Sequence, residues 1–161
     1  MPIHASEATL KDLQRVFQYA FGDPTPPRNY IRPQAVTITG PFVLGDVEIH
    51  PVDLPHGRMT TTGLIFWRGG RKLLAYFTDC AEVPEDAVEA ARGVDTLVVD
   101  ALRKAPHPTH MSVEMACDSA RRIGPRRTFF THMCHDLGHA ETEANLPENI
   151  RLAYDGLRIE I

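Results

Sequence analysis

Cysteine is scarce in this chain, and the few cysteines show no pairing pattern. Three are present among 161 residues, at positions 80, 117 and 134, and no two of them have C-x-x-C spacing. An odd, widely spaced set argues against a disulfide framework and favours reduced thiols, so we expect a cytoplasmic protein. We interpret Cys80 and Cys134 as buried, inert thiols.

Long apolar runs and a strong net charge are missing as well. The longest apolar stretches, such as 64–67 and 97–99, are far too short to cross a bilayer, and the first residues do not resemble a signal peptide. A net charge of −4 argues against non-specific binding to nucleic acid or to an anionic membrane. With 43% hydrophobic and 24% charged residues, the composition is globular, and we expect a single domain over residues 1–161.

Hydrophobic periodicity predicts a β-rich first half. Ser6 can cap a helix that runs to about Tyr19, and no strand is expected before it. A loop follows, marked by prolines at positions 24, 26, 27 and 33. Alternation with a period of two then predicts strands at 35–39, 47–52, 63–68 and 72–78, the last two joined by a turn at Gly69-Gly70.

The second half alternates between helix and strand. We expect a helix from Pro84 to Arg92, a strand at 96–99, a helix from Ser112 to Ile123 and a strand at 128–131. A short helix at 141–145 and a closing hairpin of strands 151–153 and 157–161, turned at Asp155-Gly156, complete the chain. This order predicts the α+β class, with sheets covered by helices.

Polar residues follow the predicted strands where each strand ends. His56, Asp79, Asp100 and His132 all stand in this position. Any one of these aspartates could simply be a turn residue. The four together favour a functional site, because loops at the carboxyl ends of strands are held by a rigid scaffold.

Five ordered motifs give the chain a family resemblance. They resemble the later motifs of metallo-β-lactamase-fold hydrolases, most closely the branch of PhnP-type cyclic phosphodiesterases and, more distantly, tRNase Z. The motifs are Leu54-Pro55-His56-Gly57, Phe77-Thr78-Asp79-Cys80, Val99-Asp100-Ala101-Leu102-Arg103, Pro106-His107-Pro108-Thr109-His110-Met111-Ser112 and Phe130-Thr131-His132. Because Ala5-Ser6-Glu7 resembles mid-chain sequence of complete members, the resemblance implies the C-terminal portion of an αββα four-layer fold, incomplete at its N-terminus.

The resemblance also implies a site with two divalent metal ions, zinc or manganese. His56 would bind one ion, His132 the other, and Asp79 would bridge them, since a carboxylate has two oxygens for two cations. His110 would donate a proton to the leaving oxygen or bind phosphate. The implied reaction is hydrolysis of a small phosphodiester, with Asp79 and His110 as catalytic residues.

The remaining histidines carry weaker signals. We interpret His107 as solvated or structural, and His135 as a residue that at most contacts a metal ligand without binding metal itself. His4, His50 and His139 are expected at the surface or in structural roles.

One motif of complete family members has no counterpart here. Members of the resembled family carry an early H-x-H-x-D-H motif, and this sequence has none. Two protein ligands per ion fall short of the three typical of a catalytic zinc site, so we expect weak metal binding by this chain alone. Three explanations stay open: a fragment of a longer enzyme, a non-catalytic binding domain on the same fold, or a site completed by a second polypeptide. Either a homo-oligomer or a missing N-terminal segment would cover the exposed sheet edges.

Overall fold

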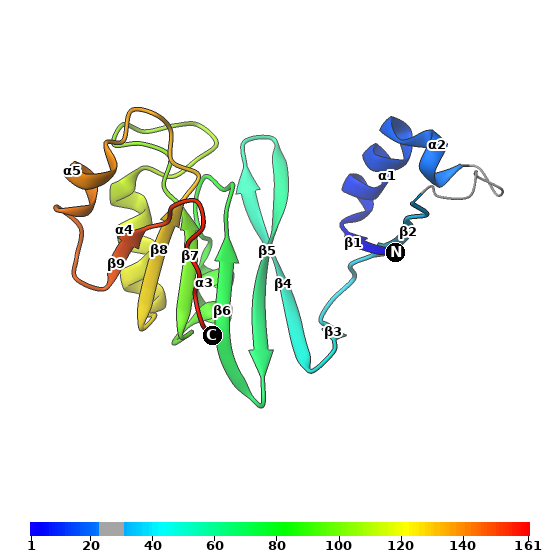
Figure 1. Cartoon of the computed structure of the whole chain (residues 1–161), viewed down its shortest axis with the longest axis horizontal. Coiled ribbons are helices and arrows are strands. Elements are labelled where there is room, and N and C mark those ends of the chain that lie inside the picture. The colour runs from blue at the N-terminus through cyan, green and yellow to red at the C-terminus, as the bar shows by residue number, and fades with distance from the viewer. Residues whose placement is uncertain (23–30) are drawn as a thin grey trace. The chain divides into compact units, whose positions relative to one another are not determined.

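The computed structural model describes residues 1–22 and 31–161, which divide into two compact units, Met1–Phe42 and Val43–Ile161 (Figure 1). Three of the four predicted loop prolines, at positions 24, 26 and 27, lie outside the described residues. Within the described part of the chain, no helix has the length and apolarity needed to cross a membrane. That both units belong to a single domain stays a prediction.

The first unit is a small layer of two strands and two helices. Strand β1 (Pro2–Ala5) pairs in parallel with β2 (Gln34–Thr37), and α1 (Glu7–Val16) and α2 (Gln18–Phe21) lie between them in sequence. The predicted cap is confirmed, since the Ser6 hydroxyl accepts a hydrogen bond from the Thr9 amide at 3.2 Å. The predicted single helix ends early, because Phe17 leaves helical geometry at φ −111° and ψ 43°.

The expectation that no strand precedes this helix is wrong. Strand β1 has four residues, begins with a proline and shows no clear alternation. Its ladder depends on residues 34–37, about thirty positions away, and such a non-local pairing leaves little trace in a short sequence window.

A seven-stranded mixed sheet dominates the second unit. Its order follows the sequence, β3-β4-β5-β6-β7-β8-β9. The antiparallel part contains β4 (Val47–His56), β5 (Met59–Arg68) and β6 (Arg71–Phe77), and β3 (Phe42–Leu44) forms its edge. Strands β7 (Thr96–Asp100), β8 (Arg127–Thr131) and β9 (Ile150–Leu152) continue parallel to β6. The carboxyl ends of β6, β7 and β8 therefore meet at one edge.

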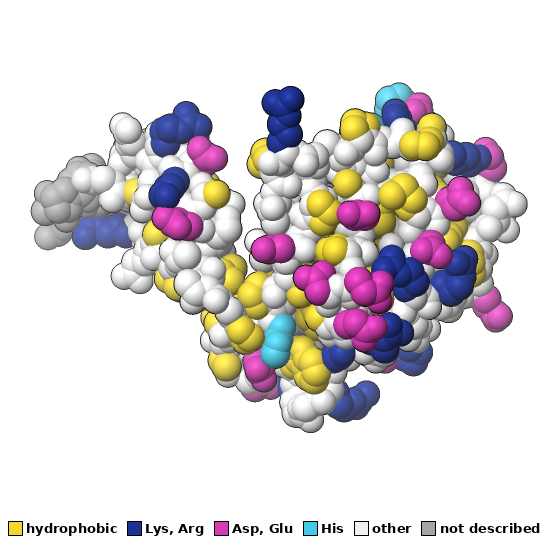
Figure 2. All heavy atoms as spheres, turned by 180° about the vertical axis from the view of Figure 1, so that it is seen from behind, with side chains coloured by type: hydrophobic (Ala, Val, Ile, Leu, Met, Phe, Trp, Pro, Cys, Tyr) yellow, Lys and Arg dark blue, Asp and Glu magenta, His cyan; other side chains and the backbone are white. Residues whose placement is uncertain are grey.

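Helices α3 (Glu85–Ala91) and α4 (Val113–Ile123) cover one face of this sheet. The shared core joins Val88 and Ile123 from the helices to Phe77, Val99 and Phe130 from the strands, all of them buried. Apolar residues of these strands that alternate with the core residues point to the other face. Figure 2 shows the side of this unit opposite to the view of Figure 1, with acidic and basic side chains interspersed over it.

The helix boundaries follow the predicted stop signals. The Ser112 hydroxyl caps α4 by accepting from the Met115 amide at 3.2 Å, and Gly124 ends the helix with φ +68°. Helix α5 (His139–Glu143) begins two residues earlier than predicted.

The predicted closing strand at 157–161 is wrong. The turn itself is present, because the Leu157 amide donates to the Tyr154 carbonyl at 3.0 Å and Gly156 has φ +89°. The five residues that follow pair with no strand among the described residues, and a strand needs a ladder partner. The predicted α+β class is confirmed.

Candidate metal centre

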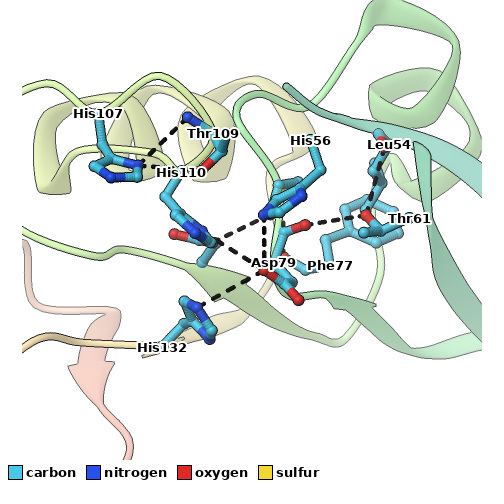
Figure 3. A network of polar contacts seen from close by, with 11 residues as sticks. Leu54, His56, Thr61, Phe77, Asp79, His107, Thr109, His110 and His132 are labelled. Atoms are coloured by element: carbon cyan, nitrogen blue, oxygen red, sulfur yellow. Dashed lines mark hydrogen bonds and ion pairs between the residues drawn. The ribbon is translucent and has the colours of Figure 1, made fainter. Parts of the chain in front are cut away.

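Four strands of the sheet deliver polar side chains to the same edge. His56 is the last residue of β4 and Asp100 the last of β7, while Asp79 lies two residues after β6 and His132 directly after β8. The loop after β7 returns over this edge and adds His110 (Figure 3). The structure thus brings together all of the residues predicted for the site.

The Asp79 carboxylate is the point on which three histidines converge. Its Oδ1 lies 3.1 Å from His56 Nε2, 3.7 Å from His110 Nδ1 and 3.7 Å from His132 Nε2 (Figure 3). The ring of His110 stands between the other two, with centroid distances of 4.9 Å to His56 and 4.7 Å to His132. Three imidazoles around one carboxylate oxygen form a donor set typical of zinc or manganese sites.

Two residues of this cluster have strained backbones. Asp79 has φ +65° and His132 has φ +62°, and they are the non-glycine residues with positive φ among the described residues. Such a conformation costs about 1–3 kcal/mol for a non-glycine residue and is concentrated at functional sites. The Thr61 hydroxyl holds the Asp79 loop by donating to the Asp79 carbonyl at 3.0 Å.

A second carboxylate, Asp100, lies fully buried behind His110. Its Oδ2 accepts a hydrogen bond from His110 Nδ1 at 2.8 Å and another from the Cys80 amide at 3.1 Å. A carboxylate oxygen can only accept, so His110 carries its proton on Nδ1 and leaves Nε2 to other partners. Asp100 was noted in the sequence only for its place at a strand end, and its pairing with His110 depends on how the loop after β7 folds back.

The donors around Asp79 can be grouped for a metal in two ways. Asp79, Asp100, His110 and His132 each offer an atom within 4.8 Å of the others. However, a hydrogen bond of 2.8 Å already joins His110 Nδ1 to Asp100 Oδ2, so these two atoms would have to part in order to bind a cation. Two atoms of the cluster, His56 Nε2 and Asp100 Oδ1, are buried without a hydrogen-bond partner among the described residues, as expected of a ligand whose partner is a cation. The set His56, Asp79 and His132 therefore fits a metal better.

The neighbouring histidines and cysteines lie outside this set. His107 Nδ1 lies 3.2 Å from the Thr109 hydroxyl, and partial burial together with Arg103 lowers the pKa of His107. The His135 side chain is 95% exposed and lies beside Asp136. Burial, reinforced by the charges of Asp100 and Asp79, raises the pKa of Cys80 to about 12, and the predicted burial of this thiol is confirmed. Cys134 is only half-buried.

The sequence matches a family model described as the Beta-lactamase superfamily domain over residues 1–133. A diphosphatase from the PhnP family has a similar structure, with a TM-score of 0.86 and 34% sequence identity over 99% of this chain and 58% of that chain. Zn²⁺-bound PqqB from Methylobacterium extorquens shares the fold, with a TM-score of 0.74 and 19% identity over 100% of this chain and 65% of that chain.

One curated relative carries a different name. The Octanoyltransferase of Porphyromonas gingivalis is 26% identical over 160 residues, which are 98% of this chain and 32% of that protein. The chain thus spans about a third of this relative and less than two thirds of the diphosphatase.

Proposed function

Because the chain belongs to the Beta-lactamase superfamily domain family, we propose that it serves metal-dependent hydrolysis of a phosphodiester-type bond in a small molecule. The observation that carries this proposal is the convergence of His56, His110 and His132 on Asp79 Oδ1. The 34% identity with a PhnP-family diphosphatase supports a phosphorus centre as the point of attack.

Three side chains would hold the metal ions. His56 and His132 would each bind one ion, and Asp79 would bridge the two. When bound, two divalent ions polarise a phosphoryl oxygen and supply a nucleophilic hydroxide near neutral pH. Which metal the site takes is part of the proposal, since imidazole and carboxylate ligands suit zinc and manganese alike.

His110 would handle the proton that the leaving oxygen requires. The Asp100 carboxylate fixes the ring through Nδ1, so that the opposite nitrogen, Nε2, is the atom left to face substrate. Asp100 is fully buried and accepts the Nδ1 proton, so the proton that His110 would donate is one carried on Nε2. We therefore assign His110 as the general acid and Asp100 as its positioning residue.

The chain supplies fewer donors than a finished two-metal centre needs. Three side chains shared between two ions leave each ion short of the three protein ligands typical of catalytic zinc. The remaining donors would come from polypeptide that this chain does not contain, either in the same longer protein or in a partner. A non-catalytic binding domain on the same fold is the second candidate function, and this donor shortage is the observation that favours it.

The name of the curated relative does not alter the assignment. The chain matches only 32% of that protein, and the rest of its length has no counterpart here. Cys80, the cysteine nearest to Asp79, is fully buried and cannot serve as an exposed acyl acceptor.

Metal analysis and turnover test the proposal together. The purified chain is loaded with Zn²⁺ or Mn²⁺, the bound metal is quantified, and hydrolysis of bis(p-nitrophenyl) phosphate is compared with that of p-nitrophenyl octanoate. Because the donor set is short, we expect weak metal uptake and slow phosphodiester turnover, which Asp79→Ala abolishes and Asp46→Ala retains. Asp46 is a suitable control because it is 76% exposed and precedes β4, whose other end carries His56.

Each alternative gives a different result. Metal uptake that survives His56→Ala but not Asp100→Asn would replace the proposed ligand set with the other one. Turnover of the octanoyl ester alone would replace phosphodiester hydrolysis with acyl chemistry. Absence of both metal and turnover in the folded chain would favour the non-catalytic binding domain.

A further inference from the structure

His107 is a second imidazole beside the general acid, and the proposed reaction does not yet use it. Its ring centroid lies 5.0 Å from that of His110, with the two ring planes tilted by 35°. In Figure 3 the ring of His110 lies between His107 and Asp79. A substrate whose phosphorus centre lies at the metal ligands and whose leaving oxygen faces His110 would therefore extend its leaving group toward His107.

The hydrogen bonds of His107 define its tautomer. The Thr109 amide donates to His107 Nδ1 at 3.4 Å, and the Thr109 hydroxyl lies 3.2 Å from the same nitrogen (Figure 3). A backbone amide can only donate, so Nδ1 is the acceptor and the neutral ring carries its proton on Nε2. Burial, together with the positive charge of Arg103, lowers the pKa of His107, which favours the neutral ring. His107 is thus the opposite tautomer to His110, whose proton is on Nδ1.

The Nε2–H group of His107 can donate to a ligand. Among the described residues it has no hydrogen-bond partner, because both contacts of the ring are made by Nδ1. It is also not one of the buried atoms that lack a partner, so this nitrogen is open to solvent. A neutral N–H group forms a hydrogen bond with an oxygen acceptor whether or not that acceptor carries a charge. The side chain therefore offers a donor for an uncharged oxygen of the leaving group.

The loop that carries His107 restricts where this donor can lie. Pro106 and Pro108 flank the histidine, and a residue that precedes proline is confined to extended backbone geometry. The Arg103 guanidinium donates to the Pro106 carbonyl at 2.8 Å and so holds the loop from within. A donor that is oriented in advance loses little freedom when it binds a ligand, which is what a specificity-determining group requires.

We propose that His107 is a specificity-determining residue, whose Nε2–H group donates a hydrogen bond to a second oxygen of the leaving group, on the carbon next to the one that bears the scissile oxygen. Two rings whose centroids are 5.0 Å apart can contact oxygen atoms on neighbouring carbons of one leaving group. The substrate class is then a phosphodiester of a polyol or of an alkoxy alcohol, rather than of a plain alkyl alcohol. This inference rests on the proposed function, because it takes the leaving oxygen to face His110.

Two diesters of matched shape test the proposal. Bis(2-methoxyethyl) phosphate has an ether oxygen where bis(n-butyl) phosphate has a methylene group, so the two differ only in the acceptor that His107 would meet. The chain loaded with Zn²⁺ is titrated with each diester, binding is followed through the histidine signals in ¹⁵N NMR spectra, and kcat/KM is measured separately. We expect the methoxyethyl diester to bind about tenfold more tightly, with the larger shift of the His107 Nε2 signal.

Three variants assign the preference to this side chain. His107→Phe keeps an aromatic ring beside His110 but has no donor, so it should bind both diesters equally. His107→Gln places an amide N–H group near the position of Nε2 and should restore most of the preference. His50→Phe is the matched control, because His50 is also a half-buried histidine against an aromatic ring, that of Trp67, at a tilt of 35°. It should keep the full preference, and circular dichroism checks that all three variants are folded.

The outcomes separate this inference from the proposed function. Tighter binding of the methoxyethyl diester without turnover of either diester would support the role of His107 and contradict hydrolysis. Turnover of both diesters with equal affinity would leave hydrolysis standing and overturn the role of His107, as would the absence of measurable binding of either. A preference that His107→Phe retains would assign the contact to another residue. A ¹⁵N spectrum with the His107 proton on Nδ1 would overturn the tautomer on which the inference depends.

Discussion

Asp100 Oδ2 lies 2.8 Å from His110 Nδ1, and the carboxylate is fully buried behind the imidazole. A buried carboxylate against a ring nitrogen fixes both the tautomer and the orientation of the ring. The pair links the last residue of β7 to the loop that returns over the metal centre, so one carboxylate controls the side chain that would face the leaving group.

We predict that the His110 and Asp100 variants lose activity in proportion to how much the leaving group needs a proton. A p-nitrophenolate leaves without assistance, whereas an alkoxide needs a general acid. His110→Ala should therefore slow hydrolysis of an alkyl phosphodiester about 10²–10⁴-fold and that of bis(p-nitrophenyl) phosphate much less. Asp100→Asn should also slow hydrolysis of the alkyl phosphodiester more than that of bis(p-nitrophenyl) phosphate, but by a smaller factor than His110→Ala. The metal content should stay constant.

A spectroscopic signature checks the same pair without turnover. In the unchanged chain, ¹⁵N NMR should show His110 protonated on Nδ1. Asp100→Asn should shift this equilibrium toward the other tautomer, because an amide can also present a donor to the ring. If Asp100→Asn slowed the hydrolysis of both substrates equally and left the tautomer of His110 unchanged, Asp100 would only support the fold.

The strained backbone of Asp79 gives a prediction about stability. At φ +65° the Cβ of an alanine lies too close to the following carbonyl oxygen, and glycine has no Cβ. Metal-free Asp79→Gly should therefore be more stable than Asp79→Ala by about 1–2 kcal/mol. Asp118, inside α4, is the control, because there glycine should be less stable than alanine by about 1 kcal/mol. Urea unfolding of the four variants measures both differences. The same sign at both positions would contradict strain at Asp79.

Much of the fold and the site could be predicted because their signals are local. The strand ends before Asp79, Asp100 and His132 follow directly from apolar runs, whereas the strand that carries His56 extends four residues past its predicted end at residue 52. Ser112 and Gly124 mark the two ends of α4 by capping chemistry that involves only a few neighbouring residues.

The features that escaped prediction depend on partners distant in sequence. Strand β1 forms only against residues 34–37, and residues 157–161 have the pattern of a strand but pair with no strand in the part of the chain that the structure describes. The contact of Asp100 with His110 likewise requires the path of a ten-residue connection, which no local pattern specifies. Local preference decides which residues can form a strand, and only tertiary context decides whether they do.

Asp95 and Arg126 directly precede β7 and β8, at the amino ends of these strands, and form an ion pair whose contribution to stability depends on pH. Hydrogen bonds from Arg126 to Asp95, at 2.7 Å and 3.2 Å, lower the pKa of Asp95 below its ordinary value of 3.8 despite partial burial. A carboxyl group with a lowered pKa in the folded state stabilises the fold above its unfolded pKa and loses that contribution as the pH falls through the folded value. The stability gap between the unchanged chain and Asp95→Asn should thus be constant near neutral pH and shrink below about pH 4.

Denaturant titrations at several pH values measure this gap. Asp118→Asn is the control, since Asp118 makes an exposed ion pair on the surface of α4 and such pairs contribute little. A gap for Asp95→Asn that widens as the solution is acidified would have the wrong sign and would exclude the assigned cause.

Gly57 sets how closely the loop of His56 approaches the loop of His110. It has φ +63°, and a Cβ at this position would lie 2.8 Å from Thr109 Cγ2. Gly57→Ala should therefore lose stability for two reasons, the left-handed backbone and the clash, with a total of about 2–4 kcal/mol. The displaced Thr109 would also move its neighbour His110, so affinity for metal and activity should fall together with stability.

Gly45 separates the two causes. It has the same φ of +63°, but nothing lies within 4 Å of its would-be Cβ, so Gly45→Ala should show the backbone cost alone. Adding Thr109→Ser to Gly57→Ala removes the clashing methyl group, so the double variant should regain the part of the stability loss that exceeds the loss of Gly45→Ala. The backbone cost should stay. If the double variant were no more stable than Gly57→Ala, contact with Thr109 could not be the reason for glycine at position 57, and the spacing of His56 and His110 would depend on the strands alone.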